Sequence, residues 1–404
     1  MKFITNRFLI AIAAAATTLW CPAGMAQAPN HHVFTNDQVS SGNTTSIYVA
    51  DGTAGKPKLT LVTIIDTGGL GATLSAPAQV QVVSAEADGN NCLFLVDGGS
   101  SDVAAGDIRT GHRVDAGTFK GGSGDDGGFF GMSLTTTGHH VYAAFTGSDT
   151  IASFSIQSSC GLTYLGSVSA ERLNGGAPLG LASTGYIMVV TYGDGSIESF
   201  NIQGAVPVSN GDVQLTTGFT DGNGGSAAGV QISSDGHFAI FADATGSFTE
   251  AEVSDMSSGK LTTTIDYGGQ NAVNGSLGAG QNSNFAWLSP NEKLVYISNT
   301  YSGQVTGVNF NAMTGVLSYG CISGVLKGFG TNFLFPAGLA TVRGYMGDDI
   351  WVAEYSSQPP SYIGMVSVGE YGGQCVLSET STSPVADAQS AGLESIAAVP
   401  PRPF

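Results

Sequence analysis

The sequence predicts an all-β fold, a seven-bladed β-propeller with four antiparallel strands in each blade. Three observations lead to this prediction: short apolar runs that alternate with period two, turns rich in Gly, Asn and Ser between them, and the recurrence of this unit along the chain. Alternating runs of this length are typical of β-strands and are too short for helices. A single sheet of this kind leaves its faces uncovered, so neighbouring copies are needed to bury them.

The clearest unit runs from Phe285 to Gly320 and reads as four strands, FAWLS, LVYIS, QVTGVNF and VLSYG. Three polar turns separate the strands, at residues 290–293, 299–303 and 311–315. Gly, Asn, Pro and Ser bound each run, which favours tight turns and an antiparallel meander.

Six copies of the second strand, with the turn and third strand that follow it, recur along the chain. Their starts lie 48, 46, 51, 56 and 56 residues apart. The six copies begin at Leu93, Val141, Ile187, Phe238, Leu294 and Ile350. A period near fifty residues with four strands in each repeat is typical of a β-propeller.

The remaining blade is expected to form from both ends of the chain. Residues 31–37, 45–51 and 59–65 read as second, third and fourth strands that lack a first strand. Residues 391–400 are similar to the first strands of the other units, so we expect the C-terminal strand to complete the N-terminal blade. Such closure removes the open sheet edges that favour aggregation.

Residues 1–28 have the three parts of a secretory signal peptide. Lys2 and Arg7 supply positive charge, Phe8 to Trp20 form a short apolar run, and Ala26-Gln27-Ala28 fits a cleavage site. The apolar run is too short to span a bilayer, and no later stretch is long and apolar enough. We therefore expect a secreted or periplasmic protein whose residues 29–404 form one propeller domain.

The chain is strongly acidic, with 31 acidic residues, 13 basic residues and a formal net charge of −18. A negative surface potential opposes binding to nucleic acid and to anionic lipid. It is compatible with cations, neutral glycans and basic partners. We expect a monomer whose partner is a small molecule, a glycan or a surface protein.

Four cysteines follow the predicted signal peptide, and each falls in a different blade: Cys92, Cys160, Cys321 and Cys375. The outer strands of neighbouring blades diverge, whereas a disulfide needs its two Cα atoms within about 7 Å. We therefore expect mostly unpaired, buried thiols. The spacing of these cysteines matches no zinc motif.

The loops between second and third strands and the connections between blades should share one face of the propeller, which we call the loop face. Long loops on a rigid scaffold commonly carry binding sites. The candidate binding residues in these loops are Asp97, Asp102, Asp149, Asp194, Asp243 and Tyr301. Their carboxylates suit a hard cation such as calcium, although Asp is also a common turn residue. His139, His140 and His237 fall in turns of the opposite face.

The repeat resembles the lactonase-type seven-bladed propellers, the family of bacterial 6-phosphogluconolactonase and carboxymuconate cyclase, and the related YVTN-repeat surface proteins. The segments SSDGHFAIFAD, SPNEKLVYISN and FTGSDTIASFSI carry this resemblance. It implies the propeller fold and, in active members, a lactonase site with His, Arg and Glu near the central channel. Of the ionisable residues, only Glu394 falls at the corresponding first-strand positions of this chain.

Three functions remain open on the sequence. The first is a binding module. The second is a lactonase-like carboxylic-ester hydrolase, in which Glu394, Asp125 or Asp126 acts as general base and Arg172 stabilises the oxyanion. The third is a structural protein of the cell envelope or extracellular space. Arg172 and Lys327 are the basic residues expected on the loop face, with Lys120 at its edge.

Overall fold

The structure is a computed structural model that describes most of the chain between residues 31 and 399. The described residues are 31–53, 56–72, 80–85, 90–107, 112–128, 131–170, 176–212, 214–215, 227–243, 249–268, 277–278, 283–329, 335–343, 348–356, 359–372, 374–387, 389–390, 392–393 and 395–399. The signal peptide predicted for residues 1–28 lies outside them. They contain strands and turns but no helix, so the all-β prediction is confirmed.

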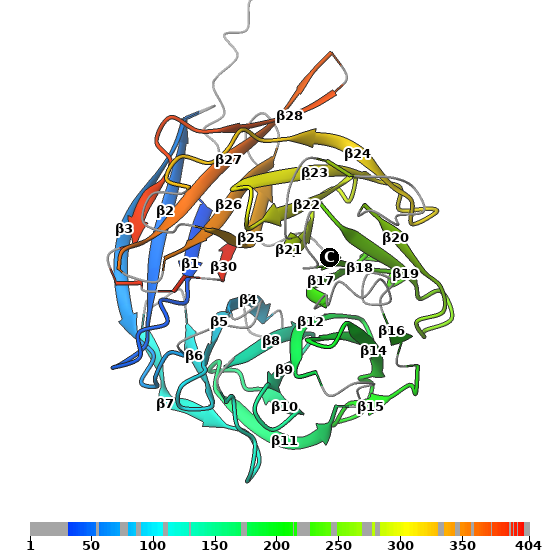
Figure 1. The fold of residues 1–404 in the computed structure, drawn as a ribbon. Coiled ribbons are helices and arrows are strands. Elements are labelled where there is room, and N and C mark those ends of the chain that lie inside the picture. The colour runs from blue at the N-terminus through cyan, green and yellow to red at the C-terminus, as the bar shows by residue number, and fades with distance from the viewer. Residues whose placement is uncertain are drawn as a thin grey trace, which may run out of the picture.

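The strands form antiparallel sheets that surround a central axis, with the first strand of each unit nearest the middle (Figure 1). The N-terminal blade orders β3 (Lys56–Asp66), β2 (Thr44–Thr53), β1 (His31–Thr35) and β30 (Ile396–Val399). The next orders β4 (Val80–Ala85), β5 (Asn90–Asp97), β6 (Asp102–Asp107) and β7 (His112–Lys120). The third orders β11 (Leu162–Ser169), β10 (Thr150–Ile156), β9 (His140–Phe145) and β8 (Met132–Thr137).

The later sheets repeat this meander and add short accessory strands. One sheet orders β12 (Pro178–Thr184), β13 (Ile187–Tyr192), β14 (Ser196–Asn201) and β15 (Val208–Ser209), and β16 (Gln214–Leu215) also pairs with β14. An eight-stranded sheet orders β20 (Thr264–Tyr267), β19 (Ala251–Asp255), β18 (Phe238–Asp243), β17 (Ala227–Ile232), β21 (Ser283–Leu288), β22 (Leu294–Asn299), β23 (Gln304–Phe310) and β24 (Leu317–Ile322). The last orders β25 (Phe335–Arg343), β26 (Asp348–Tyr355), β27 (Ser361–Tyr371) and β28 (Gln374–Glu379), and β29 (Val385–Asp387) also pairs with β27.

The eight-stranded sheet consists of two four-stranded meanders that share one edge. Their inner strands β17 and β21 meet in a single parallel bridge between Gly229 and Phe285. A Cβ at residue 229 would overlap the ring of Phe285, so glycine is needed for this close approach. Hydrogen bonding therefore gives six sheets in the described residues, and one of these six joins two meanders.

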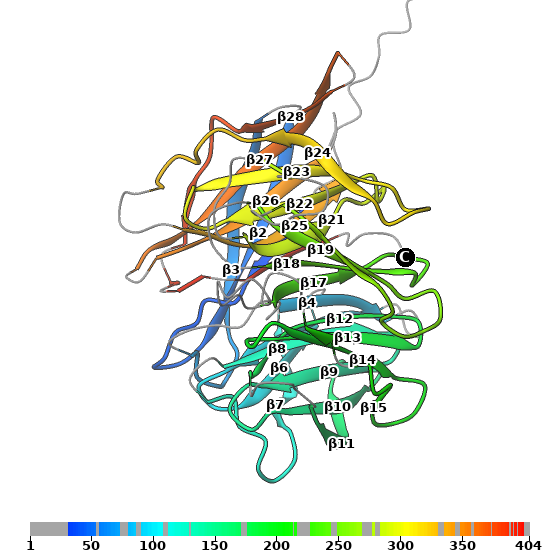
Figure 2. The same cartoon turned by 45° about the vertical axis from the view of Figure 1, so that its right-hand side comes forward.

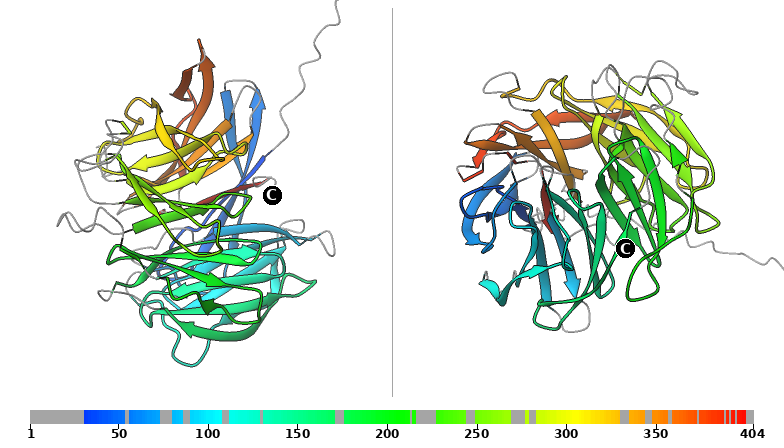
Figure 3. Two further views of the ribbon diagram at one scale, coloured as in Figure 1. Left: turned by 90° about the vertical axis from the view of Figure 1, so that its right-hand side faces the viewer. Right: turned by 60° about the horizontal axis from the view of Figure 1, so that its bottom comes forward.

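The two ends of the described chain meet in one sheet, as the sequence predicts. Strand β30 pairs antiparallel with β1, in a register that runs from His32 opposite Val399 to Thr35 opposite Ile396. Figure 1 shows β30 next to β1, and the left view of Figure 3 shows the red C-terminal strand beside the blue N-terminal strand. This pairing supplies the inner strand that the N-terminal blade lacks.

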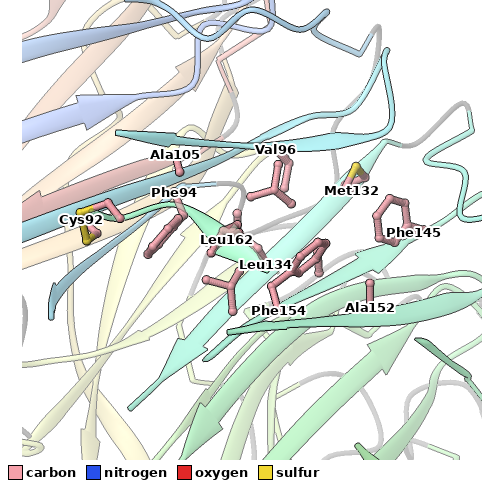
Figure 4. Close-up of a cluster of buried hydrophobic side chains, with 14 residues drawn as sticks. Cys92, Phe94, Val96, Ala105, Met132, Leu134, Phe145, Ala152, Phe154 and Leu162 are labelled. Atoms are coloured by element: carbon pink, nitrogen blue, oxygen red, sulfur yellow. A yellow bond between two sulfur atoms is a disulfide. The ribbon is translucent and has the colours of Figure 1, made fainter. Parts of the chain in front are cut away.

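The hydrophobic core is divided into layers between neighbouring sheets. Figure 4 shows one such layer, in which Phe94 and Val96 of β5 face Phe145 of β9 and Phe154 of β10. The second and third strands carry buried side chains on both faces, because a sheet lies on each side of them. Buried side chains therefore occur at successive positions of β9 and β13, and the period-two alternation predicted from the sequence does not hold strictly there.

Two disulfides join neighbouring sheets, and the expectation of mostly unpaired thiols is wrong. Cys92 of β5 bonds to Cys160, which lies in the turn between β10 and β11, with Cα atoms 5.4 Å apart. Cys321 of β24 bonds to Cys375 of β28, with Cα atoms 5.6 Å apart. Neighbouring sheets approach more closely at these points than a general divergence of outer strands suggests, which brings the Cα atoms within bonding range.

Removing the first disulfide should destabilise the fold. In the double variant Cys92→Ser, Cys160→Ser the bridge no longer restricts the unfolded chain over a sequence separation of 68 residues, so we expect the free energy of unfolding to fall by about 4 kcal/mol. Urea unfolding monitored by tryptophan fluorescence would measure the loss. Unchanged stability, or free thiols at both positions in the native protein, would contradict the assignment.

Candidate functional site

Two aspartates predicted as binding residues lie side by side on the loop face. Asp97 ends β5, Asp102 begins β6, and the two residues are paired directly in the antiparallel register. Asp97 is fully buried and Asp102 is nearly so. The tight turn between the two strands therefore places two carboxyl groups together in a site that water does not reach.

Asp97 fastens its blade to the N-terminal blade. Its Oδ1 accepts hydrogen bonds from Asn43 Nδ2 at 2.8 Å and from Thr67 Oγ1 at 2.7 Å, and both donors belong to connections of the N-terminal blade. The backbone of Gly69 covers the carboxylate so closely that a Cβ there would overlap it. The carboxylate is thus part of the contact between blades and is shielded from solvent.

The surroundings of the Asp97–Asp102 pair favour the protonated form of both carboxyl groups. The pKa of Asp97 is raised to about 7, mainly by burial; the hydrogen bonds from Thr67 and Asn43 oppose this rise, and the charge of Asp102 adds to it. Burial also raises the pKa of Asp102. Among the described residues no donor bonds to Asp97 Oδ2 or Asp102 Oδ1, which further disfavours the ionised form of these buried carboxyl groups.

A second carboxyl pair, which the sequence analysis missed, joins the two ends of the chain. Asp37 Oδ2 accepts hydrogen bonds from Thr44 Oγ1 at 2.8 Å and Ser46 Oγ at 2.9 Å, and the Thr35 hydroxyl donates to Oδ1. Burial and then the charge of Asp387 raise the pKa of Asp37 to about 7. Asp37 could have been found by aligning the repeats, because Asp37 in VFTND and Asp97 in LFLVD lie at equivalent ends of their second strands.

Buried amide groups link these pairs across the loop face. Asn43 Nδ2 donates to Asn36 Oδ1 at 2.7 Å, and Asn36 Nδ2 donates to the carbonyl oxygen of Val96 at 2.8 Å. Asn43 also donates to Asp97. The loop at residues 36–43 is therefore held rigidly against the second blade, which pre-organises the outer surface of this face.

The other predicted binding residues do not converge on these pairs. Asp194 accepts a hydrogen bond from Ser196 N at 2.9 Å within its own turn, and Asp243 is buried at the end of β18. Asp149 occupies a turn with φ of 55°, and Tyr301 is 59% exposed. In the described part of the chain, no three His, Cys, Asp or Glu side chains form a group that could hold a metal ion.

The described residues of the predicted hydrolase site, Asp125 and Asp126, have different surroundings. Asp125 accepts hydrogen bonds from Thr150 Oγ1 at 2.7 Å and Ser167 Oγ at 2.6 Å, so it organises its own blade. Asp126 is exposed and accepts from Ser101 Oγ at 3.1 Å. Arg172 and Glu394 lie outside the described residues.

The ammonium group of Lys327 is hydrogen-bonded to backbone carbonyl oxygens. Its Nζ donates to the carbonyl oxygens of Thr380 at 2.6 Å and Ser383 at 3.3 Å.

On the opposite face, His139, His140 and His237 lie at or beside the turns that precede β9 and β18, as expected. His237 Nδ1 lies 3.2 Å from an Asp235 oxygen.

Comparison with solved structures identifies the architecture. A Bacteroides fragilis protein assigned provisionally as a 6-phosphogluconolactonase is similar with a TM-score of 0.62 and 15% identity, covering 92% of this chain and 98% of that one. A protein of unknown function from Desulfotomaculum acetoxidans gives 0.62 at 13% identity, over 92% and 99%. The periplasmic gluconolactonase of Pseudomonas aeruginosa gives 0.52 at 16% identity, over 72% and 80%.

These similarities show that the chain has the fold of lactonase-type β-propellers. At such low identities they establish the fold and leave the activity to the residues of this chain. No protein-family model matches the sequence, and no curated protein is significantly similar to it. The described residues include no helix of the length and apolarity that crossing a membrane requires.

The buried carboxyl pairs should make stability fall as pH rises. Asp97 has a pKa of about 7 in the folded chain against 3.8 ordinarily, so between these values the folded state binds more protons than the unfolded state. Its contribution is therefore complete below pH 4 and is lost as pH rises through 7. Asp97→Asn keeps the Oδ1 acceptor and removes this titration, so we expect a gain on the order of 1–3 kcal/mol at pH 8.

Urea unfolding at pH 5 and pH 8 would measure this effect. The variant should show a shallower dependence of the unfolding free energy on pH than the native sequence. Asp126→Asn, which replaces an exposed carboxyl group on the same face, is the matched control. A native protein that is more stable at pH 8 than at pH 5 would refute the interpretation.

Proposed function

We propose that the chain is an exported lactonase-type propeller that binds a small molecule, a glycan or a protein partner on its loop face. The observation that carries this proposal is the buried network of Asn36, Asn43 and Asp97, which fixes neighbouring loops of that face. Loops held in this way lose little conformational entropy when a ligand binds. Perturbed carboxyl groups such as Asp97 also concentrate at functional sites.

Export is supported by two independent features. Residues 1–28 have the pattern of a secretory signal peptide. The two disulfides, Cys92–Cys160 and Cys321–Cys375, are typical of proteins that mature in an oxidising compartment. We therefore propose a secreted or periplasmic monomer. Its negative charge favours neutral or cationic ligands and disfavours nucleic acid, and calcium is the cation we propose for the exposed carboxylates.

A screen of thermal stability against calcium chloride, glucono-1,5-lactone and cellohexaose tests binding to the loop face. A ligand that binds the folded state alone adds about 2.7 kcal/mol of stability at a hundredfold excess over its Kd. We expect at least one of these probes to raise the Tm, and Tyr301→Ala or Asp126→Asn to reduce the shift.

The control for this screen is Tyr186→Ala, because Tyr186 is exposed in the turn between β12 and β13 on the opposite face. This variant should keep the full shift. A screen without any shift, or a shift that survives both loop-face substitutions, would contradict binding on this face.

Lactone hydrolysis is the second candidate function, and the names of two similar structures favour it. A carboxyl group with a pKa near 7, such as Asp97, is suited to general acid–base catalysis. Its burial beneath Gly69 argues that another carboxylate would meet the substrate, and Glu394 and Asp126 are the candidates.

If the chain is a hydrolase, it should hydrolyse glucono-1,5-lactone. Glu394→Gln should then lower kcat by about a hundredfold or more, because the loss of a general base typically has an effect of this size. A pH-stat assay measures the rate against spontaneous hydrolysis, and the double disulfide variant controls for lost stability. A rate no higher than the spontaneous one would reject this candidate.

A further inference from the structure

A groove lies on the outer rim, where two neighbouring blades meet through their outermost strands. It has a volume of about 500 Å³, within the usual range of ligand sites. Strand β24 forms one wall and β28 the other. The lining residues are Asn309, Tyr319, Gly320, Cys321, Ile322, Gln374, Cys375, Val376 and Leu377.

The groove is fixed covalently. The Cys321–Cys375 disulfide ties β24 to β28. A Cβ at Gly307 would lie 3.0 Å from Cys321 Sγ and 3.4 Å from Cys375 Sγ, so this glycine gives the sulfur pair its space. The register of β23 and β24 shifts between Gly307 and Val308, which leaves Gly320 as an extra residue beside Tyr319. Such bulges re-aim the neighbouring side chains.

The walls of the groove present an aromatic ring and amide groups. Tyr319 is 52% exposed, and its backbone carbonyl oxygen accepts a hydrogen bond from Asn309 Nδ2 at 3.0 Å. That bond orients the Asn309 side chain and leaves its Oδ1 as an acceptor. Gln374 adds an exposed amide on the facing strand, next to Tyr371, which is 84% exposed at the end of β27. The hairpin of β27 and β28 projects beyond the neighbouring sheets (Figures 1 and 2).

The lining contains no Asp, Glu, Lys, Arg or His, although the chain as a whole carries a net charge of −18. A charged ligand would therefore find no counter-charge in these walls. A purely apolar ligand would cover the amides of Asn309 and Gln374 without giving them partners, which is unfavourable. The class of ligand that fits these walls is uncharged and carries both apolar faces and hydrogen-bonding groups.

We propose that this groove binds a neutral oligosaccharide. A sugar ring offers a face of C–H bonds that packs on the electron-rich face of a tyrosine ring, and its hydroxyl groups both donate to and accept from amides. The groove is separate from the loop face, so oligosaccharide binding in the groove does not depend on the function proposed for the loop face.

Isothermal titration of the disulfide-bonded mature chain with maltohexaose, cellohexaose and chitohexaose tests the proposal. We expect at least one of them to bind, and Tyr319→Ala to weaken its affinity by about tenfold or more, as loss of an aromatic anchor does. Gln374→Ala should also weaken binding, whereas Tyr319→Phe should keep it because the stacking ring remains. Tyr186→Ala is the matched control, since Tyr186 is also 52% exposed but lies outside the groove.

Two results would overturn the proposal. The first is the absence of binding by all three oligosaccharides at millimolar concentration. The second is binding that Tyr319→Ala leaves unchanged. Binding that is lost in Tyr301→Ala but kept in Tyr319→Ala would reject the groove and support the loop face, so the two sites are distinguishable. Folding of each variant is checked by its Tm.

Discussion

The pairing of β30 with β1 is the interaction on which the other sheets depend. Each sheet buries its two faces against neighbours, so the ring is complete only when its first and last members meet. This pairing brings Val33 and Ala398 into one apolar layer with Trp351 of β26. Without it, the N-terminal blade would lack its inner strand, and two strand edges would be open to other chains.

Polar side chains at the ends of second strands have the same structural role in different blades. Asn299 ends β22, accepts from Thr249 Oγ1 at 3.1 Å and donates to Thr306 Oγ1 at 2.9 Å. Asp97 ends β5 and accepts from Asn43 and Thr67 of the preceding blade. An amide thus suffices for this role at residue 299, whereas Asp97 fulfils it with a group whose burial as an anion is unfavourable.

The repeat made most of the strands and the closure predictable, because strand periodicity and turn residues are local properties. The disulfides were not predictable, since Cys321 and Cys375 approach only through the packing of two sheets, which a strand pattern does not encode. The Asp97–Asp102 pair follows from one tight turn and was found as two loop-face candidates. The Asp37–Asp387 pair requires ring closure across almost the whole chain. The exposure of the turn carboxylates was also not predictable, because Asp125 bonds a hydroxyl group of β10 and Asp194 bonds its own turn.

The positions of the two disulfides give the ring a mechanical asymmetry. Cys92–Cys160 joins one pair of adjacent blades and Cys321–Cys375 another, while neither disulfide reaches the described residues of the N-terminal blade, which lies between these pairs, or the sheets of β12 to β15 and β17 to β20. A pulling force on the ends of the chain acts directly on β1 and β30 and peels them apart there. The two disulfide-bonded pairs lie on either side of this seam, so we expect the ring to open first between β1 and β30.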